Sequence, residues 1–277
     1  NKFCKGIEYV AGNSMKVGII GCGFIGSEIA LFIDKNKNYD LIALNDIDKN
    51  KVRELAGKLE ISRPKFMEID ELIRKSGLII EAATKNIIGT ILKNKNLDKE
   101  NKKLLIMSTG GLISNIKLLN KIKNCEILLP SGAIAGLDAI KAVSGRIKSL
   151  TLTTTKPIKG LEGAPYISKN NIDLGNIKGN KVIFEGGLSE AVNGFPQNIN
   201  VAATLFLASK FDRIKVKIIA DSDTKFNTHE IEATGDFGVI KAKTQNLPSK
   251  NPKTSYLAVL SAIQTIKNIK NNMKIGN

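Results

Sequence analysis

Six residues near the start of the chain, Gly21-Cys22-Gly23-Phe24-Ile25-Gly26, constrain its fold more than any other feature. They lie between a short apolar run, Lys16 to Ile20, and a segment with helical spacing, Ser27 to Asp34. In a strand-turn-helix unit the first glycine allows the tight turn and the second lets a pyrophosphate approach the backbone. The third lets the helix pack against the strand. The motif therefore predicts a dinucleotide-binding turn to which Gly21, Gly23, Phe24, Ile25 and Gly26 contribute.

An acidic residue after the next strand supports this interpretation. Asp46 follows the last glycine by 20 residues, the separation expected of the residue that binds the adenosine ribose. Its carboxylate should accept hydrogen bonds from the ribose hydroxyls and repel a 2′-phosphate, and no Arg occurs in residues 45–48 to offset that repulsion. We therefore expect NAD as the cofactor, with NADP as the alternative.

The pattern that follows alternates strands and helices. Strands that are apolar throughout and separated by helical segments are typical of a parallel sheet covered on both faces. We therefore predict an N-terminal Rossmann domain, a doubly wound α/β sheet. The expected strands are Lys16 to Ile20, Leu41 to Leu44, Leu78 to Ala83 and Leu104 to Ser108, and the expected helices are Ser27 to Asp34, Lys49 to Leu59 and Ile69 to Ser76.

A second domain is expected from about residue 140, because later strands alternate in polarity as half-exposed strands do. We predict an α+β, mostly antiparallel domain for substrate binding or oligomerisation at 141–252. The dinucleotide-binding domain would comprise 15–140 and a C-terminal helix, 253–273, that returns to it. Residues 1–14 are interpreted as an upstream extension. The expected elements are strands at Leu150 to Thr155, Lys181 to Phe184, Lys215 to Ala220, Thr228 to Ala233 and Gly238 to Thr244, and helices at Asn198 to Ser209 and Thr254 to Ile269.

The composition argues against several other classes of protein. The formal charge of +16 comes mostly from lysines scattered among Asn and Ile, so the sequence contains no concentrated basic segment. Only 5% of residues are aromatic, which is too few to predict a surface that stacks on bases. We therefore do not expect nucleic-acid binding. Three separated cysteines form no C-x-x-C pair, which argues against a zinc site or a disulfide framework and favours a reducing, cytoplasmic setting. No apolar run approaches the roughly 20 residues that a membrane-spanning helix needs.

Small residues follow two of the predicted strands at the edge where an open parallel sheet binds its ligand. Ala82 and Ala83 follow one, Thr109 and Gly110 the other, and we expect all four to border the nicotinamide half of the cofactor. Ordinary turn chemistry is the alternative reading of such residues.

Two further residues are candidates for the chemistry. His229 is the only histidine, and in its predicted strand it shares a face with Ile231 and Ala233, so it is either a catalytic acid-base group or a buried structural imidazole. Lys156 ends a Thr-rich strand just before Pro157 and could hold an anionic substrate. A solvated surface lysine is its alternative reading.

Several segments together resemble the L-aspartate dehydrogenase family, which is related to the dihydrodipicolinate reductases. The resemblance extends from Met15 to about Lys267. The segments that carry it are Val17 to Gly26, Ile79 to Ala83, Pro130 to Ala139, Gly194 to Ala203, Asn227 to Ile231 and Gly235 to Gly238.

This resemblance implies NAD(P)-dependent oxidation of L-aspartate to iminoaspartate, which hydrolyses to oxaloacetate and ammonia or feeds quinolinate and NAD biosynthesis. It also implies a homodimer or larger homo-oligomer. From the composition and the cysteine pattern described above, we expect a cytoplasmic protein with neither nucleic acid, membrane nor metal as a partner. The resemblance assigns His229 as catalytic and places Ala133 and an Asn, either Asn198 or Asn200, at the nicotinamide side. We assign Asn198 to the cofactor, and Asn200 with Lys156 to the substrate.

One position departs from the family pattern, because the family often has an Arg before the Lys-Pro of this strand, whereas this chain has Thr155 before Lys156 and Pro157. If Lys156 takes the place of that Arg in substrate binding, it acts as a point charge instead of a bidentate clamp on a carboxylate. Two alternatives remain: a dihydrodipicolinate reductase-like enzyme, and an NAD-binding redox sensor or scaffold without turnover.

Overall fold

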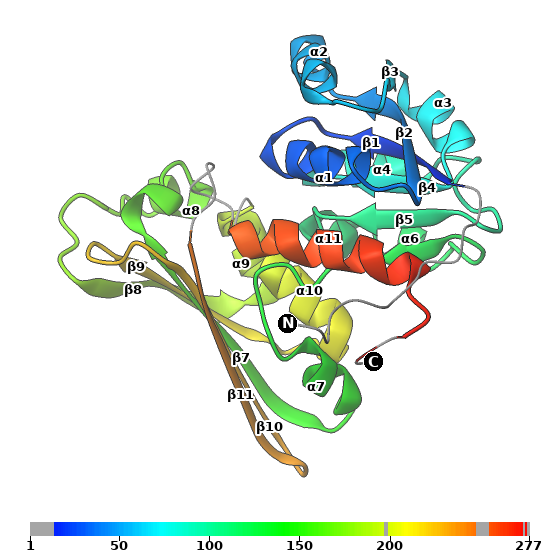
Figure 1. Cartoon of the computed structure of the whole chain (residues 1–277). Coiled ribbons are helices and arrows are strands. Elements are labelled where there is room, and N and C mark those ends of the chain that lie inside the picture. The colour runs from blue at the N-terminus through cyan, green and yellow to red at the C-terminus, as the bar shows by residue number, and fades with distance from the viewer. Residues whose placement is uncertain (1–13, 197–198, 248–254, 274, 276–277) are drawn as a thin grey trace, which may run out of the picture.

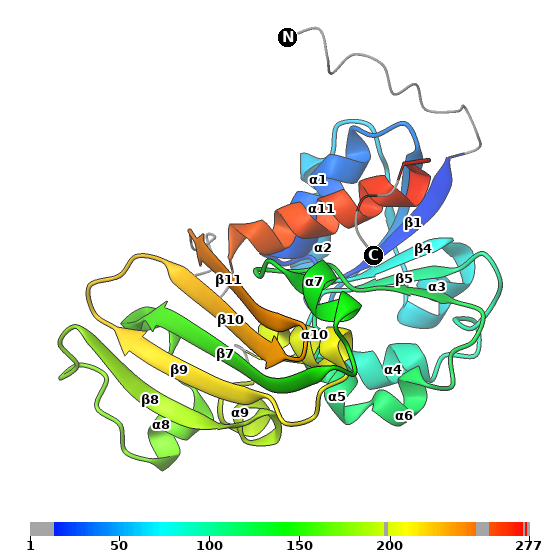
Figure 2. The ribbon, with the colours of Figure 1, turned by 90° about the horizontal axis from the view of Figure 1, so that it is seen from below.

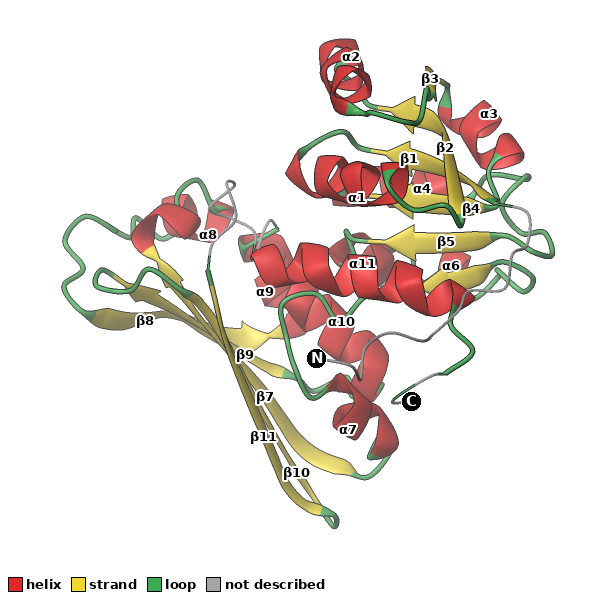
Figure 3. Cartoon of the chain, in the orientation of Figure 1, coloured by secondary structure: helices red, strands yellow, loops and turns green. Residues whose placement is uncertain are grey.

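The computed structural model describes residues 14–196, 199–247, 255–273 and 275. This part of the chain forms two lobes, each built on one sheet (Figure 1). The first lobe contains β1 to β6 with α1 to α6, the second contains β7 to β11 with α7 to α10, and α11 returns to the first. Figure 3 shows the two groups of strands separated by helices.

The first lobe is a six-stranded sheet in the order β3-β2-β1-β4-β5-β6, with every neighbouring pair parallel. This order confirms the predicted Rossmann-like fold. Its strands are β1 (Met15–Ile20), β2 (Tyr39–Asn45), β3 (Lys65–Phe66), β4 (Leu78–Glu81), β5 (Lys103–Ile106) and β6 (Glu126–Leu128). Its helices are α1 (Phe24–Asp34), α2 (Lys49–Lys58), α3 (Ile69–Lys75), η2 (Lys85–Ile87), α4 (Ile88–Leu92), α5 (Gly110–Ser114) and α6 (Ile116–Leu119).

Apolar side chains fill both faces of this sheet, which is why its strands read as continuous apolar runs. Within β4, Leu78 and Ile80 pack with α1 and α2, whereas Ile79 packs on the opposite face with α3 and α4. All three side chains are fully buried. Burial of each contributes about 1.5–3 kcal/mol relative to exposure, so both helical layers stabilise the sheet.

The second lobe has a five-stranded sheet in the order β11-β10-β7-β9-β8, which Figure 2 shows from below. Only the pairing of β7 with β9 is parallel, so the predicted mostly antiparallel character is confirmed. Its strands are β7 (Ile147–Pro157), β8 (Asn180–Gly187), β9 (Lys215–Asp221), β10 (Asn227–Gly235) and β11 (Gly238–Asn246). Its helices are α7 (Leu137–Ala142), η3 (Ile158–Gly160), α8 (Pro165–Lys169), α9 (Leu188–Gly194) and α10 (Asn200–Ser209).

The two faces of this second sheet differ in chemistry. One face packs Leu152 and Ile231 against α9 and α10 in a continuous apolar core. The other face is polar, and Glu230 and Glu232 there pair with the lysines directly opposite on β11 at 3.2–3.3 Å. This difference explains the alternating pattern of β7 and β10 and directs His229 towards the helices.

Helix α11 (Tyr256–Lys270) follows the second lobe along the chain and packs on α1 of the first. Ala262 and Ile266 are fully buried in the same cluster as β1, and the Tyr39 hydroxyl donates a 2.5 Å hydrogen bond to the Ile266 carbonyl oxygen. Helix α11 therefore contributes to the core of the first lobe. At 15 residues it is too short to cross a membrane, and no other described helix is long and apolar enough to do so.

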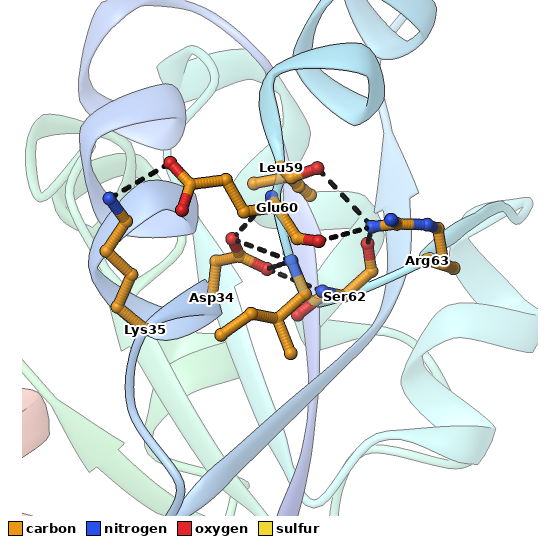
Figure 4. Close-up of polar contacts among 7 residues, drawn as sticks. Asp34, Lys35, Leu59, Glu60, Ser62 and Arg63 are labelled. Carbon is orange, nitrogen blue, oxygen red and sulfur yellow. Dashed lines mark hydrogen bonds and ion pairs between the residues drawn. The ribbon is translucent and has the colours of Figure 1, made fainter.

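A buried carboxylate fixes the loop after α2 to the end of α1 (Figure 4). Asp34 accepts hydrogen bonds from the backbone N–H groups of Glu60, Ile61 and Ser62. From the other side, the Arg63 guanidinium donates to the carbonyl oxygens of Leu59, Glu60 and Ser62. The Asp34 carboxylate thus satisfies N–H groups of this short loop, and the Arg63 guanidinium satisfies its carbonyl groups.

Candidate active site

The glycine turn has the local geometry that its sequence predicts. Gly21 has a φ of +102°, and a Cβ there would lie 2.5 Å from the carbonyl oxygen of Ala82. A Cβ on Gly26 would collide with the Gly21 carbonyl oxygen, so this glycine lets α1 approach the turn. At Gly23, by contrast, no atom lies within 4 Å of the Cβ position. The backbone is therefore open to a ligand at the second glycine.

The start of α1 can hold an anion. Gly23 precedes the helix, no side chain caps its first N–H groups, and its first turn has no acidic residue. These N–H groups point outward from the positive end of the helix. The open backbone at Gly23 and the uncapped helix start together fit the pyrophosphate of a dinucleotide.

Asp46 lies at the end of β2, beside the turn. Its Oδ2 accepts a hydrogen bond from the Cys22 N–H at 2.7 Å, and its Oδ1 accepts one from the Asp48 N–H at 2.9 Å. Burial, with the Asp46 charge as a second cause, raises the pKa of the Cys22 thiol to about 12. The thiol therefore stays protonated near neutral pH and acts as a packing group, not as a nucleophile.

Asp46 also lines a hollow, the glycine-loop cleft, whose wall includes Gly21, Gly23, Asp46, Ala82, Ala83 and Thr84. Lys49 and Lys51 line it too, and the Lys49 ammonium lies 4.8 Å from the centre of the Phe66 ring. Both lysines lie beyond residues 45–48, the segment beside Asp46 from which the preference for NAD is predicted. They bring positive charge to the side of the cleft where a ribose phosphate would lie.

A second hollow, the lobe-interface cavity, lies between the two sheets. Both lobes contribute to its wall, together with α11 and the loop before α7. Six of the predicted site residues line it: Ile25, Thr109, Ala133, Lys156, Asn200 and His229.

Polar contacts join the lobes at one side of this cavity. The Thr109 hydroxyl donates to the Asn200 carbonyl oxygen at 2.8 Å and accepts from the Thr204 hydroxyl at 2.9 Å. The Gly110 N–H donates to Asn200 Oδ1 at 3.0 Å, and a Cβ on Gly110 would lie 2.6 Å from the Ile199 side chain. Gly110 thus permits the close approach of α10.

The loop that carries Ala133 is held from two directions. The Gly132 N–H donates to Ser261 Oγ of α11 at 3.0 Å. The Ala133 carbonyl oxygen accepts from Thr244 Oγ1 at 2.8 Å and from Asn246 Nδ2 at 3.0 Å, both on β11. Ala133 is therefore fixed at the cavity wall where the lobes and α11 meet.

His229 is buried at the cavity wall, with only 4% of its surface exposed. Its Nδ1 forms a 3.0 Å hydrogen bond with Thr154 Oγ1, and within the described part of the chain Nε2 has no such side-chain partner. Burial lowers the pKa of His229 to about 3, and the positive charge of Lys156 adds to this effect. The imidazole is therefore neutral near pH 7, the form that accepts a proton.

Lys156 lies on β7 two residues from Thr154, faces the cavity and is 4% exposed. The surface-lysine reading of this residue is wrong, because Lys156 lies on the same side of β7 as Leu152 and Thr154, the side that faces the helices. A buried ammonium beside a neutral imidazole is suited to a substrate that carries negative charge.

The structure divides the predicted residues into groups. Five line the glycine-loop cleft, namely Gly21, Gly23, Asp46, Ala82 and Ala83, and the six named above line the lobe-interface cavity. Phe24, Gly26 and Gly110 line neither hollow. The Phe24 ring instead faces Tyr256 at 6.5 Å, and the two glycines are contact points of the backbone. Asn198 lies outside the described residues.

Three polar residues near His229 were missed. Thr154 and Thr204 form the hydrogen bonds described above, and Asn227 is 1% exposed, with no hydrogen-bond partner for either amide atom among the residues that the structure describes. The alternation of β10 places Asn227 on the face of His229, a signal that was present in the sequence. In the described part of the chain, no three His, Cys, Asp or Glu side chains cluster as metal ligands would.

Comparison with known proteins identifies relatives along nearly the whole chain. Residues 138–269 match the family model for the C-terminal part of aspartate dehydrogenase, and residues 15–86 match an oxidoreductase family with an NAD-binding Rossmann fold. The chain is 44% identical to the L-aspartate dehydrogenase of Methanosarcina acetivorans, with 95% of this chain and 99% of the relative covered. It is 42% identical to that of Methanococcoides burtonii over the same shares.

A solved structure has the same architecture. The crystal structure of aspartate dehydrogenase from Thermotoga maritima is similar with a TM-score of 0.71 at 24% identity, and 95% of this chain and 99% of that chain are covered. At this level of identity the similarity concerns the fold. It extends over both lobes.

Proposed function

The chain belongs to the L-aspartate dehydrogenase family, and we propose on this premise that it oxidises L-aspartate to iminoaspartate with NAD(P)⁺. The observation that carries the proposal is the lobe-interface cavity. It brings a neutral buried imidazole and a buried ammonium from the second lobe against Ile25 and Thr109 of the dinucleotide-binding lobe.

The residues of the two hollows fit the cofactor. The N–H groups at the start of α1 would hold its pyrophosphate, and Asp46 would hold the adenosine ribose. Ile25, Thr109 and Ala133 line the cavity that would take the nicotinamide half. Bound NAD(P)⁺ supplies the acceptor for the hydride that leaves the substrate Cα.

His229 is the residue that moves a proton. The substrate amine must lose one proton before the Cα–H bond can deliver its hydride, and the neutral imidazole can take that proton at Nε2. The Thr154 hydroxyl holds the ring by Nδ1. The product is iminoaspartate in its protonated form, to which water can add.

Lys156 gives the cavity its preference for a dicarboxylate. Its ammonium would pair with a substrate carboxylate, and the negative charge of the substrate would offset the Lys156 charge that lowers the pKa of His229. Substrate binding thus makes the imidazole a better base at the moment when a base is needed. Asn200, an exposed residue that also lines the cavity, would add a polar contact.

Several finer assignments complete the proposal. We assign 15–140 with 253–273 to dinucleotide binding and 141–252 to substrate binding, and the packing of α11 on α1 supports this division. Asp46 supports NAD as the preferred cofactor. The family resemblance supports a cytoplasmic homodimer whose iminoaspartate enters NAD biosynthesis.

The test is NADH formation with NAD⁺ and L-aspartate, run beside D-aspartate and L-glutamate. Turnover should be restricted to L-aspartate and should fall by roughly 10²–10⁴-fold in His229→Ala. Lys156→Met should raise the KM for aspartate by about tenfold or more, because a buried charge partner is lost. Binding of NADH without turnover of any amino acid would contradict the proposal and favour a redox sensor.

A further inference from the structure

Glu81 is a buried carboxyl group that the reaction described above does not use. It ends β4, and its side chain is 0% exposed among apolar strand residues. Burial raises its pKa, although hydrogen bonds from Ser108 and Ala83 act in the opposite direction. A carboxyl group in such surroundings is costly unless its oxygens have donors, so its contacts indicate what it does.

These contacts join two turns of the first lobe. Oε1 accepts from the Ala83 N–H at 2.9 Å, and Oε2 accepts from the Ser108 N–H at 2.9 Å. The Ser108 hydroxyl also donates to Oε1. Ala83 follows β4 and Ser108 follows the neighbouring strand β5, so a single side chain binds both turns at the carboxyl edge of the sheet.

The same contacts explain why both strands end two residues earlier than their sequence predicts. Apolar residues were expected to extend the strands to Ala83 and Ser108, yet β4 ends at Glu81 and β5 at Ile106. The N–H groups of Ala83 and Ser108 turn to the Glu81 carboxylate. The side chain therefore replaces the ladder as the acceptor for these two groups.

Each of the two turns forms the wall of a different hollow. Ala82, Ala83 and Thr84 line the glycine-loop cleft, opposite Asp46. Met107 and Thr109, on either side of Ser108, line the lobe-interface cavity that contains His229. The position of one wall relative to the other depends on the group that joins the two turns.

A carboxylate suits this task better than a neutral acceptor. Its two equivalent oxygens accept from both backbone N–H groups at once, whereas an amide side chain would direct its NH₂ group at one of them. Thr109 extends the connection, because it binds Asn200 and Thr204 on α10. The hydrogen-bonded path thus runs from Glu81 to the second lobe.

We propose that Glu81 is a positioning residue that holds the glycine-loop cleft and the lobe-interface cavity in register, so that one dinucleotide can occupy both. The proposal deepens the function proposed above and rests on it for the identity of the cofactor. It predicts that Glu81 matters for a ligand that spans both hollows and not for one that occupies the adenosine side alone.

The test compares the binding of NADH and AMP, measured calorimetrically without substrate, in Glu81→Gln, Ser108→Ala and the matched control Glu126→Gln. Glu126 is exposed on β6. Glu81→Gln should weaken NADH binding roughly tenfold and change AMP binding by less than about twofold. Ser108→Ala removes one of the three hydrogen bonds and should weaken NADH binding roughly threefold, again without effect on AMP. Glu126→Gln should bind both ligands as the wild type does.

Equal weakening of NADH and AMP, or unchanged NADH binding, would overturn the proposal. Circular dichroism and the unfolding midpoint establish whether each variant folds, and if Glu81→Gln does not, the ratio of the two affinities in Ser108→Ala decides. Because no step of the experiment needs turnover, its result is independent of whether L-aspartate is the substrate.

Discussion

The stability of the protein should fall in mild acid because His229 is buried as a neutral imidazole. In the unfolded chain this group takes up a proton near its ordinary pKa of 6.5, whereas burial and the Lys156 charge hold the folded-state pKa at about 3. Between these values the unfolded state binds the additional proton. The free energy of unfolding therefore decreases as the pH falls through this window and is unaffected by His229 above it.

The size of the effect follows from the two pKa values. Each pH unit inside the window changes the free energy of unfolding by up to about 1.4 kcal/mol. At pH 5 the unfolded histidine is almost fully protonated and the folded one almost fully neutral, which gives a loss of about 2 kcal/mol relative to pH 8. The side chain is 4% exposed, so solvent screening reduces this value little.

The assay is urea denaturation of the wild type and His229→Gln at pH 8 and pH 5. Glutamine cannot titrate, so the loss between the two pH values should be about 2 kcal/mol smaller in the variant, while the contributions of all other groups cancel. A difference below about 0.5 kcal/mol would refute the reasoning. The ring signal of this single histidine in a proton NMR spectrum offers a direct check, since it should not titrate between pH 8 and pH 5.

Two other substitutions test the first lobe. Asp46→Ser should lower kcat/KM with NAD roughly tenfold and raise kcat/KM with NADP. The reason is that Lys49 and Lys51 remain in the cleft after the carboxylate that repels a 2′-phosphate is removed. An unchanged preference for NAD over NADP would contradict the role of Asp46. Asp34→Asn should lower the free energy of unfolding at pH 7 by about 2 kcal/mol in urea denaturation, because an NH₂ group replaces an oxygen that accepts backbone N–H bonds. Although burial opposes ionisation of Asp34, hydrogen bonds from Ser62 and Glu60 hold its pKa below the usual value, so this contribution is present at neutral pH and is lost as the pH falls through that lowered pKa. Equal stability of the Asp34 variant and the wild type at pH 7 would contradict it.

Features that depend on neighbours in the sequence were predictable. The turn at Gly21 to Gly26 and the strands predicted at Thr228 to Ala233 and Gly238 to Thr244 follow from local residue types, and the structure contains them as the glycine turn, β10 and β11. The apolar stripe of α11 indicated that the helix packs on a core. Short helices such as α4 and α5 were missed, since five residues are too few for a helical period to show.

Features that depend on strand pairing could not be predicted. Thr154 contacts His229 only because β7 and β10 pair in the register that places these two residues opposite each other, and the two strands lie far apart in the sequence. Likewise, Glu81 reads as the polar end of an apolar run, and its role becomes visible only when β5 is placed beside β4. The sequence also left open whether Lys156 binds substrate or is a solvated surface lysine, and its burial in the structure excludes the surface lysine.

The packing of α11 on α1 has a consequence for biosynthesis. The ribosome makes β1 and α1 first, but Ala262 and Ile266, which complete the core on that side of the first sheet, emerge only after the whole second lobe has been translated. The nascent first lobe therefore exposes apolar surface throughout that interval, when aggregation competes with folding. It follows that the first lobe reaches its native stability only with the second already attached, and that a fragment ending before α11 should depend on chaperones.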